Sequence, residues 1–209
     1  MWFPHSSDDQ RWAAAQAHLS DASRPLARII QRIGPCTLRP RKDYFVVLCK
    51  AIFTQQISTK VAAVLFARFR QQFPRGRPTP ELVLAIIGDA ARMRTCGLSR
   101  QKQTYIRDLA EHFASGQIPT RRLAAMPDEQ VIETLTRVKG IGRWTAEMFL
   151  IFTLNRPDVL PVDDLGLRAA AKTVFKLREL PDALSLRVLA EPWEPWRSIA
   201  TWYLWRGTA

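Results

Sequence analysis

The apolar positions of this 209-residue chain recur mostly with a helical spacing, and the alternation of apolar and polar residues that is typical of strands is nearly absent. Ser, Asp and Pro residues that favour helix starts, and Gly residues that favour helix ends, divide the chain at short intervals. The chain is therefore predicted to be all-α. The expected helices are a first one ending near 19, then about 25–33, 44–53, 60–72, 89–96, 99–115, one starting at 127, one starting at 143, then 165–175, 181–190 and 195–206.

One segment allows a competing assignment. The apolar run from Tyr44 to Phe53 is rich in residues that favour strands, and a short buried strand is the alternative there. We predict a helix because no second segment offers a partner strand.

The charge balance points to a polyanionic partner. Lys and Arg number 31 against 19 Asp and Glu, which gives a net charge of +12 and a pI near 10.5. Such an excess on a globular composition is typical of nucleic-acid-binding proteins, although it also serves plain solubility. Many of the basic residues occur in pairs or short groups, which are Arg39/Arg41/Lys42, Arg68/Arg70, Arg75/Arg77, Arg92/Arg94 and Arg121/Arg122.

The cysteines and the apolar runs bear on the compartment. Cys36, Cys49 and Cys96 are odd in number and have neither disulfide-framework nor metal-ligand spacing, so we expect reduced thiols. No basic segment followed by an apolar run begins the chain, and no apolar stretch approaches the roughly 18 residues of a membrane span. We therefore expect a cytoplasmic protein without a membrane partner.

A pair of glycines between two predicted helices is the most informative local feature. Gly140 and Gly142 lie before the apolar-periodic segment that starts at Arg143, and their bare backbone can bring the N–H groups of residues 140–143 together on an anion at a helix N-terminus. About twenty residues later, Asp163 and Asp164 precede another helix. Taken alone, such an Asp pair is more often a helix cap than a catalytic group.

Four strings in order along the chain carry a family resemblance. They are the segment 51–60 with Gln55-Gln56, the segment 97–110, the hairpin string Val-Lys-Gly-Ile-Gly-Arg-Trp-Thr-Ala at 138–146, and the tryptophan-rich segment 193–206. Together they resemble the helix-hairpin-helix (HhH-GPD) DNA glycosylase superfamily, and in particular its 3-methyladenine DNA glycosylase II branch. The resemblance implies two helical lobes with an active-site cleft between them. We expect one unit over 1–209, with one lobe at about 39–156 and the other at about 1–38 plus 157–209.

The resemblance implies a reaction and its central residue. It selects Asp164 as the catalytic carboxylate and leaves Asp163 as a helix cap or supporting group. Cleavage of an N-glycosidic bond passes through a cationic sugar, which a carboxylate stabilises while it orients or deprotonates water. Trp144 stands where relatives that cut the strand carry a nucleophilic Lys, so the expected enzyme is a monofunctional base-excision repair glycosylase that flips alkylated purines, such as 3-methyladenine and 7-methylguanine, out of duplex DNA.

The resemblance also implies the surrounding binding residues. Trp144 and Trp205 are expected to line the base pocket, with Met148 in place of an aromatic residue found in some members. Gln56 is expected to fill the gap left by the extruded nucleotide and Gln55 to contact that nucleotide or its neighbour. The alternative for both Gln residues is a plain polar helix end.

The hairpin is expected to grip the DNA backbone. Lys139, Gly140, Gly142 and Arg143 are the implied phosphate contacts. The carbonyls of Thr136, Val138 and Ile141 are the implied ligands of a possible Na⁺ or K⁺. No cofactor is expected to be required, and no iron–sulfur cluster, because cluster-bearing relatives carry four closely spaced Cys near the C-terminus and no Cys follows Cys96. We expect a monomer that acts on double-stranded DNA with damaged bases. Excision of oxidised, deaminated or mismatched bases, or DNA binding without catalysis, remain alternatives.

Overall fold

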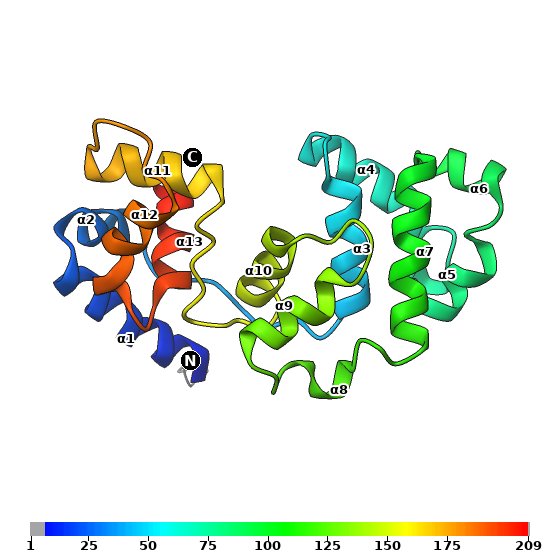
Figure 1. Ribbon diagram of the computed structural model, residues 1–209, viewed down its shortest axis with the longest axis horizontal. Helices are drawn as coiled ribbons and strands as arrows, with labels where there is room; N and C mark the ends of the chain where they lie inside the picture. The colour runs from blue at the N-terminus through cyan, green and yellow to red at the C-terminus, as the bar shows by residue number, and fades with distance from the viewer. Residues whose placement is uncertain (1–6, 209) are drawn as a thin grey trace, which may run out of the picture. The chain divides into compact units, whose positions relative to one another are not determined.

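The computed structural model describes residues 7–208, and every regular element in that range is helical (Figure 1). The all-α prediction is confirmed for this part of the chain, and none of its helices is long and apolar enough to cross a membrane. The α-helices are α1 Ser7–Ala22, α2 Arg24–Ile33, α3 Tyr44–Thr54, α4 Thr59–Arg70, α5 Pro80–Ile86, α6 Ala90–Thr95, α7 Arg100–Ala114, α8 Thr120–Leu123, α9 Asp128–Thr136, α10 Arg143–Phe152, α11 Leu165–Phe175, α12 Ala183–Ala190 and α13 Arg197–Gly207, with 3₁₀ turns at Pro74–Gly76 and Glu191–Trp193.

Side-chain caps explain where many of these helices begin. The side chains of Ser58, Asp89 and Ser99 accept N–H groups from the first turns of α4, α6 and α7, as their positions in the sequence suggested. The segment 44–53 is helical as predicted. The short helices α5 and α8 were not anticipated. For α5 the signal was present, because Thr79 caps it and Pro80 fills its first position.

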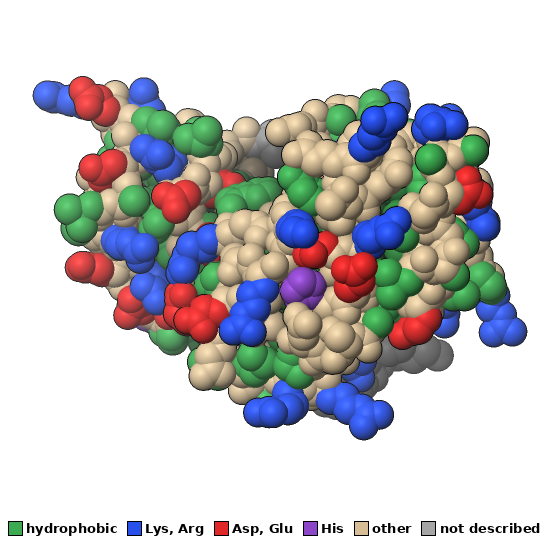
Figure 2. Space-filling model, turned by 45° about the vertical axis from the view of Figure 1, so that its right-hand side comes forward, with side chains coloured by type: hydrophobic (Ala, Val, Ile, Leu, Met, Phe, Trp, Pro, Cys, Tyr) green, Lys and Arg blue, Asp and Glu red, His purple; other side chains and the backbone are tan. Residues whose placement is uncertain are grey.

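The chain divides into two compact units. Unit 1 contains residues 1–40 and 150–209, and unit 2 contains residues 41–149. The second boundary falls within α10, whereas the family resemblance implied a boundary at about 156. Unit 2 carries 18 Lys and Arg against 9 Asp and Glu, whereas unit 1 carries 13 against 10. Most of the excess positive charge therefore belongs to unit 2, and Lys and Arg side chains are scattered with acidic ones over the face seen in Figure 2.

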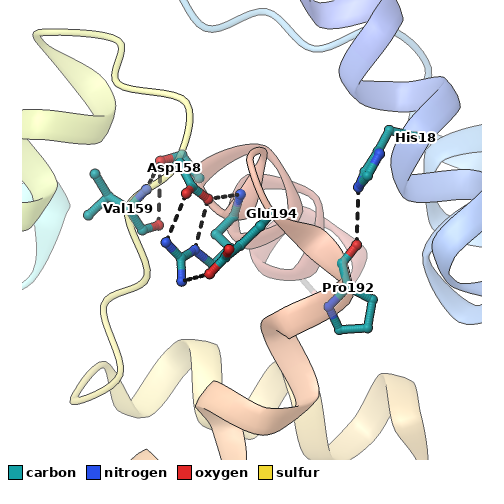
Figure 3. Close-up of polar contacts among 7 residues, drawn as sticks. His18, Asp158, Val159, Pro192 and Glu194 are labelled. Carbon is teal, nitrogen blue, oxygen red and sulfur yellow. Dashed lines mark hydrogen bonds and ion pairs between the residues drawn. The ribbon is translucent and has the colours of Figure 1, made fainter.

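The core of unit 1 is built around α13, which packs against α1, α2 and α11. Residues 198–204 of this helix are all buried, so it is enclosed on nearly every side. Arg197 fixes its start by two 2.8 Å hydrogen bonds to the Asp158 carboxylate and by an ion pair with Glu194 (Figure 3). In the same view His18 contacts the Pro192 carbonyl at 3.1 Å. These contacts hold the tryptophan-rich C-terminal segment against α1 and against the loop residues 157–159.

The core of unit 2 is built around α3, which packs against α4 and α7. Four phenylalanine rings, at Phe53, Phe66, Phe69 and Phe73, form a chain of ring contacts with centroids 5.0–6.3 Å apart. Aromatic pairs of this kind each stabilise a fold by about 0.5–1.5 kcal/mol beyond the effect of the apolar area that they bury. The cluster fixes the C-terminal end of α3, from which residues 55–57 emerge.

The three cysteines are free and buried, as expected of reduced thiols. Within residues 7–208 no group of three or more His, Cys, Asp or Glu side chains could hold a metal ion.

Candidate active site and nucleic-acid interface

The predicted hairpin is present between α9 and α10. Gly140 has φ +82°, a conformation that side chains with a Cβ rarely adopt. A Cβ at Gly140 would also overlap the ring of Tyr105, which comes from α7. Both the backbone conformation and the packing therefore require glycine at this position.

Gly142 is different. Its φ lies outside the positive region, and a Cβ built on it would meet nothing within 4 Å. Neither the turn nor the packing of this chain explains a glycine there. A bare backbone at the start of α10 leaves room for a ligand to approach the first N–H groups of that helix, which have no partner within it.

The backbone hydrogen bonds of the hairpin narrow the predicted anion site. The Ile141 N–H donates to the Val138 carbonyl at 3.0 Å, so it does not converge with the others on an anion. The Lys139 N–H donates to Oδ2 of Asp108 on α7 at 2.8 Å. Of the four N–H groups predicted to meet an anion, that of Ile141 is therefore used within the hairpin, and those of Gly142 and Arg143 lie at the start of α10.

The two basic side chains of the hairpin differ in their surroundings. The Lys139 side chain is 68% exposed, with its Nζ 3.7 Å from Asp108. The Arg143 guanidinium is held by both oxygens of Glu129 and by Glu147, and these hydrogen bonds raise the pKa of Arg143 and lower that of Glu129. Lys139 can reach a phosphate with its charge, whereas Arg143 offers its backbone N–H at the helix start.

The segment carrying Gln55 and Gln56 is tied to the hairpin. The Gln55 amide donates to the Gly140 carbonyl at 2.7 Å. Lys102 of α7 donates from Nζ to the carbonyls of Phe53 at 2.7 Å and Gln55 at 2.9 Å, and burial lowers its pKa. Gln56 is exposed with φ +58°, at the tip of the turn. Gln55 thus links the turn at 55–57 to the hairpin, whereas the exposed Gln56 side chain makes no such link.

One pocket of about 710 Å³ collects several of these residues. Gln55, Gln56, Gly140, Gly142 and Trp144 all line it, so two segments far apart in the sequence meet there. Trp144, in the first turn of α10, is 48% exposed, and Met148 one turn later is partly exposed. The structure thereby brings together five of the predicted residues of unit 2, whereas Met148, Lys139 and Arg143 do not line this pocket.

Sequence reasoning overlooked Ile57, the residue after Gln56. Its side chain is 36% exposed at the tip of the turn, although it is apolar. Apolar side chains of this kind serve as wedges between base steps in proteins that distort DNA. The signal was available, because an Ile between Gln56 and the capping Ser58 has no place on the buried face of either helix.

Asp164 is the N-cap of α11. Its Oδ1 accepts the Leu167 N–H and, at 3.0 Å, the indole N–H of Trp205. Asp163 is exposed one residue earlier, and Asp164 itself makes the capping contact. Of the two roles expected for Asp163, that of helix cap is therefore wrong, and that of a supporting group stays a prediction. Two N–H donors and the positive end of a helix hold this carboxylate in one orientation.

Two further residues of unit 1 shape the surroundings of Asp164. Gly166 was not singled out from the sequence, yet a Cβ there would lie 3.1 Å from Asp164 Oδ1 and 3.6 Å from Trp205 Nε1. The Trp205 ring stacks on Phe152 with centroids 5.7 Å apart. The string Asp-Leu-Gly-Leu therefore contains a glycine that leaves room for the carboxylate and its indole partner.

That Trp144 of unit 2 and Trp205 of unit 1 line one base pocket stays a prediction.

These features define the class of protein, an all-helical chain with a helix-hairpin-helix element and an Asp held at a helix N-terminus. Comparison with known proteins gives the family. Residues 49–195 match the model of the HhH-GPD superfamily of base excision DNA repair proteins, and the chain belongs to this superfamily.

Individual relatives of this chain are named 3-methyladenine DNA glycosylases or glycosidases. The chain is 38% identical to DNA-3-methyladenine glycosylase 1 of Schizosaccharomyces pombe over 92% of its own length and 86% of that protein. The structure of the S. pombe 3-methyladenine DNA glycosylase (Mag1) in complex with abasic DNA is similar with a TM-score of 0.80, at 36% identity over 92% of this chain and 95% of that one. A DNA-3-methyladenine glycosidase from Bacillus halodurans is similar with a TM-score of 0.81, at 32% identity over 99% and 92%.

Proposed function

We propose that this chain is a monofunctional DNA glycosylase that hydrolyses the N-glycosidic bond of alkylated purines, of the 3-methyladenine and 7-methylguanine type, in duplex DNA. The observation that carries the proposal is Asp164, a carboxylate oriented by the Leu167 and Trp205 N–H groups in a chain whose relatives are named 3-methyladenine DNA glycosylases. In this proposal the protein acts as a monomer.

Unit 2 would bind the nucleic acid. It carries the larger excess of Lys and Arg, the exposed Lys139, and the uncrowded Gly142 at the start of α10. Gln56 and Ile57, exposed at the tip of the same turn, would occupy the space left by an extruded nucleotide. Gln56 supplies hydrogen-bonding groups and Ile57 an apolar surface for the neighbouring bases.

Asp164 would act on the sugar. As the base departs with the electrons of the bond to C1′, positive charge develops on the sugar, and the ionised carboxylate stabilises that charge. The same group can accept a proton from the water that attacks C1′. A purine that alkylation has made cationic leaves without prior protonation, so no separate acid is required. Trp144 has no amine, so the imine that precedes strand cleavage cannot form at that position.

The hairpin carbonyls are suitable ligands for a monovalent cation, although one of them already accepts a hydrogen bond. A carbonyl oxygen has two acceptor positions, so that of Val138 can meet a cation while it accepts the Ile141 N–H. With the carbonyls of Thr136 and Ile141 it would supply oxygen ligands of the kind that Na⁺ or K⁺ takes, and a bound cation would add positive charge beside a DNA phosphate.

Base release from defined substrates tests the proposal. The protein is incubated with methylated duplex DNA, and the released bases are identified by mass spectrometry. We expect 3-methyladenine and 7-methylguanine, with abasic sites that stay intact until alkali is added. Release of uracil or 8-oxoguanine without 3-methyladenine would assign a neighbouring activity, and release of no base would indicate a DNA-binding protein without catalysis.

The Asp164→Asn variant tests the residue. Asn is as good an N-cap as Asp, so α11 should form normally while the negative charge is lost. We expect base release to fall by at least about 10²-fold, as when one group that stabilises transition-state charge is removed, with duplex affinity equal to the parent's or higher. Equal losses of base release and affinity would show that Asp164 is only structural.

A further inference from the structure

Unit 1 contains a second pocket, of about 570 Å³, formed by α2, the last turn of α11 and the end of α13. Arg24, Arg28 and Arg32 are spaced by four residues along one face of α2, and Lys176 caps α11. Among residues 7–208, no Asp or Glu lines this pocket. Four positive side chains therefore surround a single depression.

Protein stability accounts for only part of this charge. The Arg32 guanidinium donates to the Gly207 carbonyl at the end of α13, and Lys176 lies at the C-terminus of α11, where a cation is favourable. Arg24, by contrast, is the first residue of α2, at the positive end of the helix. A cation is unfavourable there, and Arg24 and Arg28 are both exposed. Since unit 1 has nearly as many acidic as basic residues, a general excess of charge does not explain the cluster either.

The floor of the pocket is apolar. Pro25, Ile29, Val174 and Phe175 contribute to it. The last turn of α11 also lines the pocket, and the last carbonyl groups of a helix lack partners within it, whereas the Gly207 carbonyl of α13 accepts the Arg32 guanidinium. A ligand that fits would combine negative charge, an apolar group and hydrogen-bond donors.

We propose that this pocket binds an acidic segment of a partner protein, with an apolar side chain inserted between carboxylates. Such a segment meets each feature: its carboxylates face the Arg and Lys rim, its apolar side chain covers the floor, and its backbone N–H groups reach the helix carbonyls. A DNA backbone brings charge but no N–H donors. The Phe175 ring is stacked on Trp193 with centroids 5.7 Å apart, so it offers at most one face to a base.

The pocket is separate from Asp164. The twelve residues from Asp164 to Lys176 correspond to about 18 Å along α11. Trp205 and Gly207 are two residues apart on α13, a rotation of about 200°, so the residue that bonds Asp164 and the residue that lines the pocket lie on opposite faces. A ligand can therefore occupy the pocket without displacing the contacts of Asp164.

Fluorescence anisotropy with a defined probe tests the proposal. The probe is a fluorescein-labelled peptide of repeated Glu-Glu-Leu triplets, and its controls are the same peptide with Ser for Leu and a single-stranded oligonucleotide of equal charge. We expect the probe to bind, and Arg24→Glu and Arg28→Glu each to weaken it by about tenfold or more. Arg187→Glu on α12, an exposed arginine of the same unit outside the pocket, should bind as the parent does.

Several results would overturn the proposal. One is absence of peptide binding, another is equal binding of the Ser peptide, and a third is oligonucleotide binding that Arg28→Glu abolishes while the peptide is ignored. Thermal melting confirms that each variant is folded, and Arg28→Gln repeats the measurement without a new negative charge. Base release by Arg28→Gln should match the parent, so this proposal and the glycosylase function fail independently.

Discussion

Among single residues, the two hairpin glycines are required for different physical reasons. Gly140 serves the fold, because its φ of +82° and the Tyr105 ring exclude a Cβ. Neither constraint applies to Gly142, and a Cβ there would meet nothing within 4 Å. We therefore infer that glycine is needed at this position so that a DNA phosphate can approach the backbone. The same Gly-x-Gly string thus combines a structural glycine with one that we propose serves binding.

Replacing each glycine by alanine separates the two roles. We expect Gly142→Ala to change the free energy of unfolding by less than about 1 kcal/mol, because its conformation is open to alanine, and to weaken duplex binding by about tenfold. Gly140→Ala should destabilise the protein by at least about 1 kcal/mol through its left-handed conformation. Urea unfolding and fluorescence anisotropy with a DNA duplex measure the two effects. Wild-type DNA affinity in Gly142→Ala would refute the assignment.

Trp205 acts on Asp164 through one hydrogen bond. Trp205→Phe keeps an aromatic ring against Phe152 but removes the N–H that reaches Asp164 Oδ1. A hydrogen bond to a charged group is worth about 1.5–3 kcal/mol, so we expect kcat for base release to fall about tenfold or more with a smaller change in KM. Single-turnover kinetics on a duplex with one alkylated purine gives the answer, and an unchanged kcat would show that the bond does not matter for the reaction.

Among the helices, α7 holds the two segments of unit 2 that we propose contact DNA, the turn at 55–57 and the hairpin. Lys102, Tyr105 and Asp108 are spaced by three residues and so share one face of this helix. Lys102 holds the carbonyls of Phe53 and Gln55, Tyr105 packs under Gly140, and Asp108 holds the Lys139 N–H. One helix therefore positions both the turn at 55–57 and the hairpin, and Gln55 joins these two directly.

Lys102→Met tests this link. Met keeps much of the apolar stem but loses both donors, so the turn carrying Gln56 and Ile57 should lose its fixed position. We expect base release to fall about tenfold, the energy of roughly one hydrogen bond, while the affinity for undamaged duplex stays near the parent's. Fluorescence of 2-aminopurine beside the lesion reports on extrusion.

Lys50→Met, an exposed lysine on α3, is the control. Equal loss of undamaged-duplex affinity and base release in Lys102→Met would mean that Lys102 holds the whole of unit 2 and not the turn in particular.

At the scale of the whole molecule, charge and burial are unevenly distributed. The excess of Lys and Arg belongs mainly to unit 2, which carries the hairpin, while unit 1 is close to balanced apart from the pocket at α2. Both units bury their cysteines, and burial raises the pKa of Cys36 to about 11 and also raises the pKa of Cys49 and of Cys96.

These thiols predict a loss of stability in alkali. Because each pKa is higher in the folded than in the unfolded state, the unfolded chain releases thiol protons first as the pH rises. The stabilisation is complete below the unfolded thiol pKa of about 8.5 and declines above it, by up to about 1.4 kcal/mol per pH unit for each thiol. Urea unfolding at pH 7.5 and 9.5 measures the decline.

The Cys49→Ala variant is the comparison. It should be less stable at both pH values but show a smaller decline between them. A decline that is the same in Cys49→Ala and the parent would contradict the attribution to this buried thiol.

Much of the fold followed from local signals. The caps at Ser58, Asp89 and Ser99 gave helix starts, and the helix at 44–54 followed from the lack of a partner strand. The helices α5 and α8 were missed because they are short, and short helices depend on packing more than on periodicity. The start of α11 stayed open between Asp163 and Asp164 because adjacent Asp residues are equivalent in sequence, and only the backbone turn distinguishes them.

Residue types at short spacing were enough to establish that the chain is helical, that it is basic, and that a hairpin string is followed by an Asp pair. The tertiary structure decided which groups meet: that Gln55 bonds Gly140, that Lys102 and Asp108 hold the turn and the hairpin, and that Trp205 bonds Asp164. Contacts between residues tens of positions apart depend on how helices pack, and a one-dimensional pattern does not contain that information.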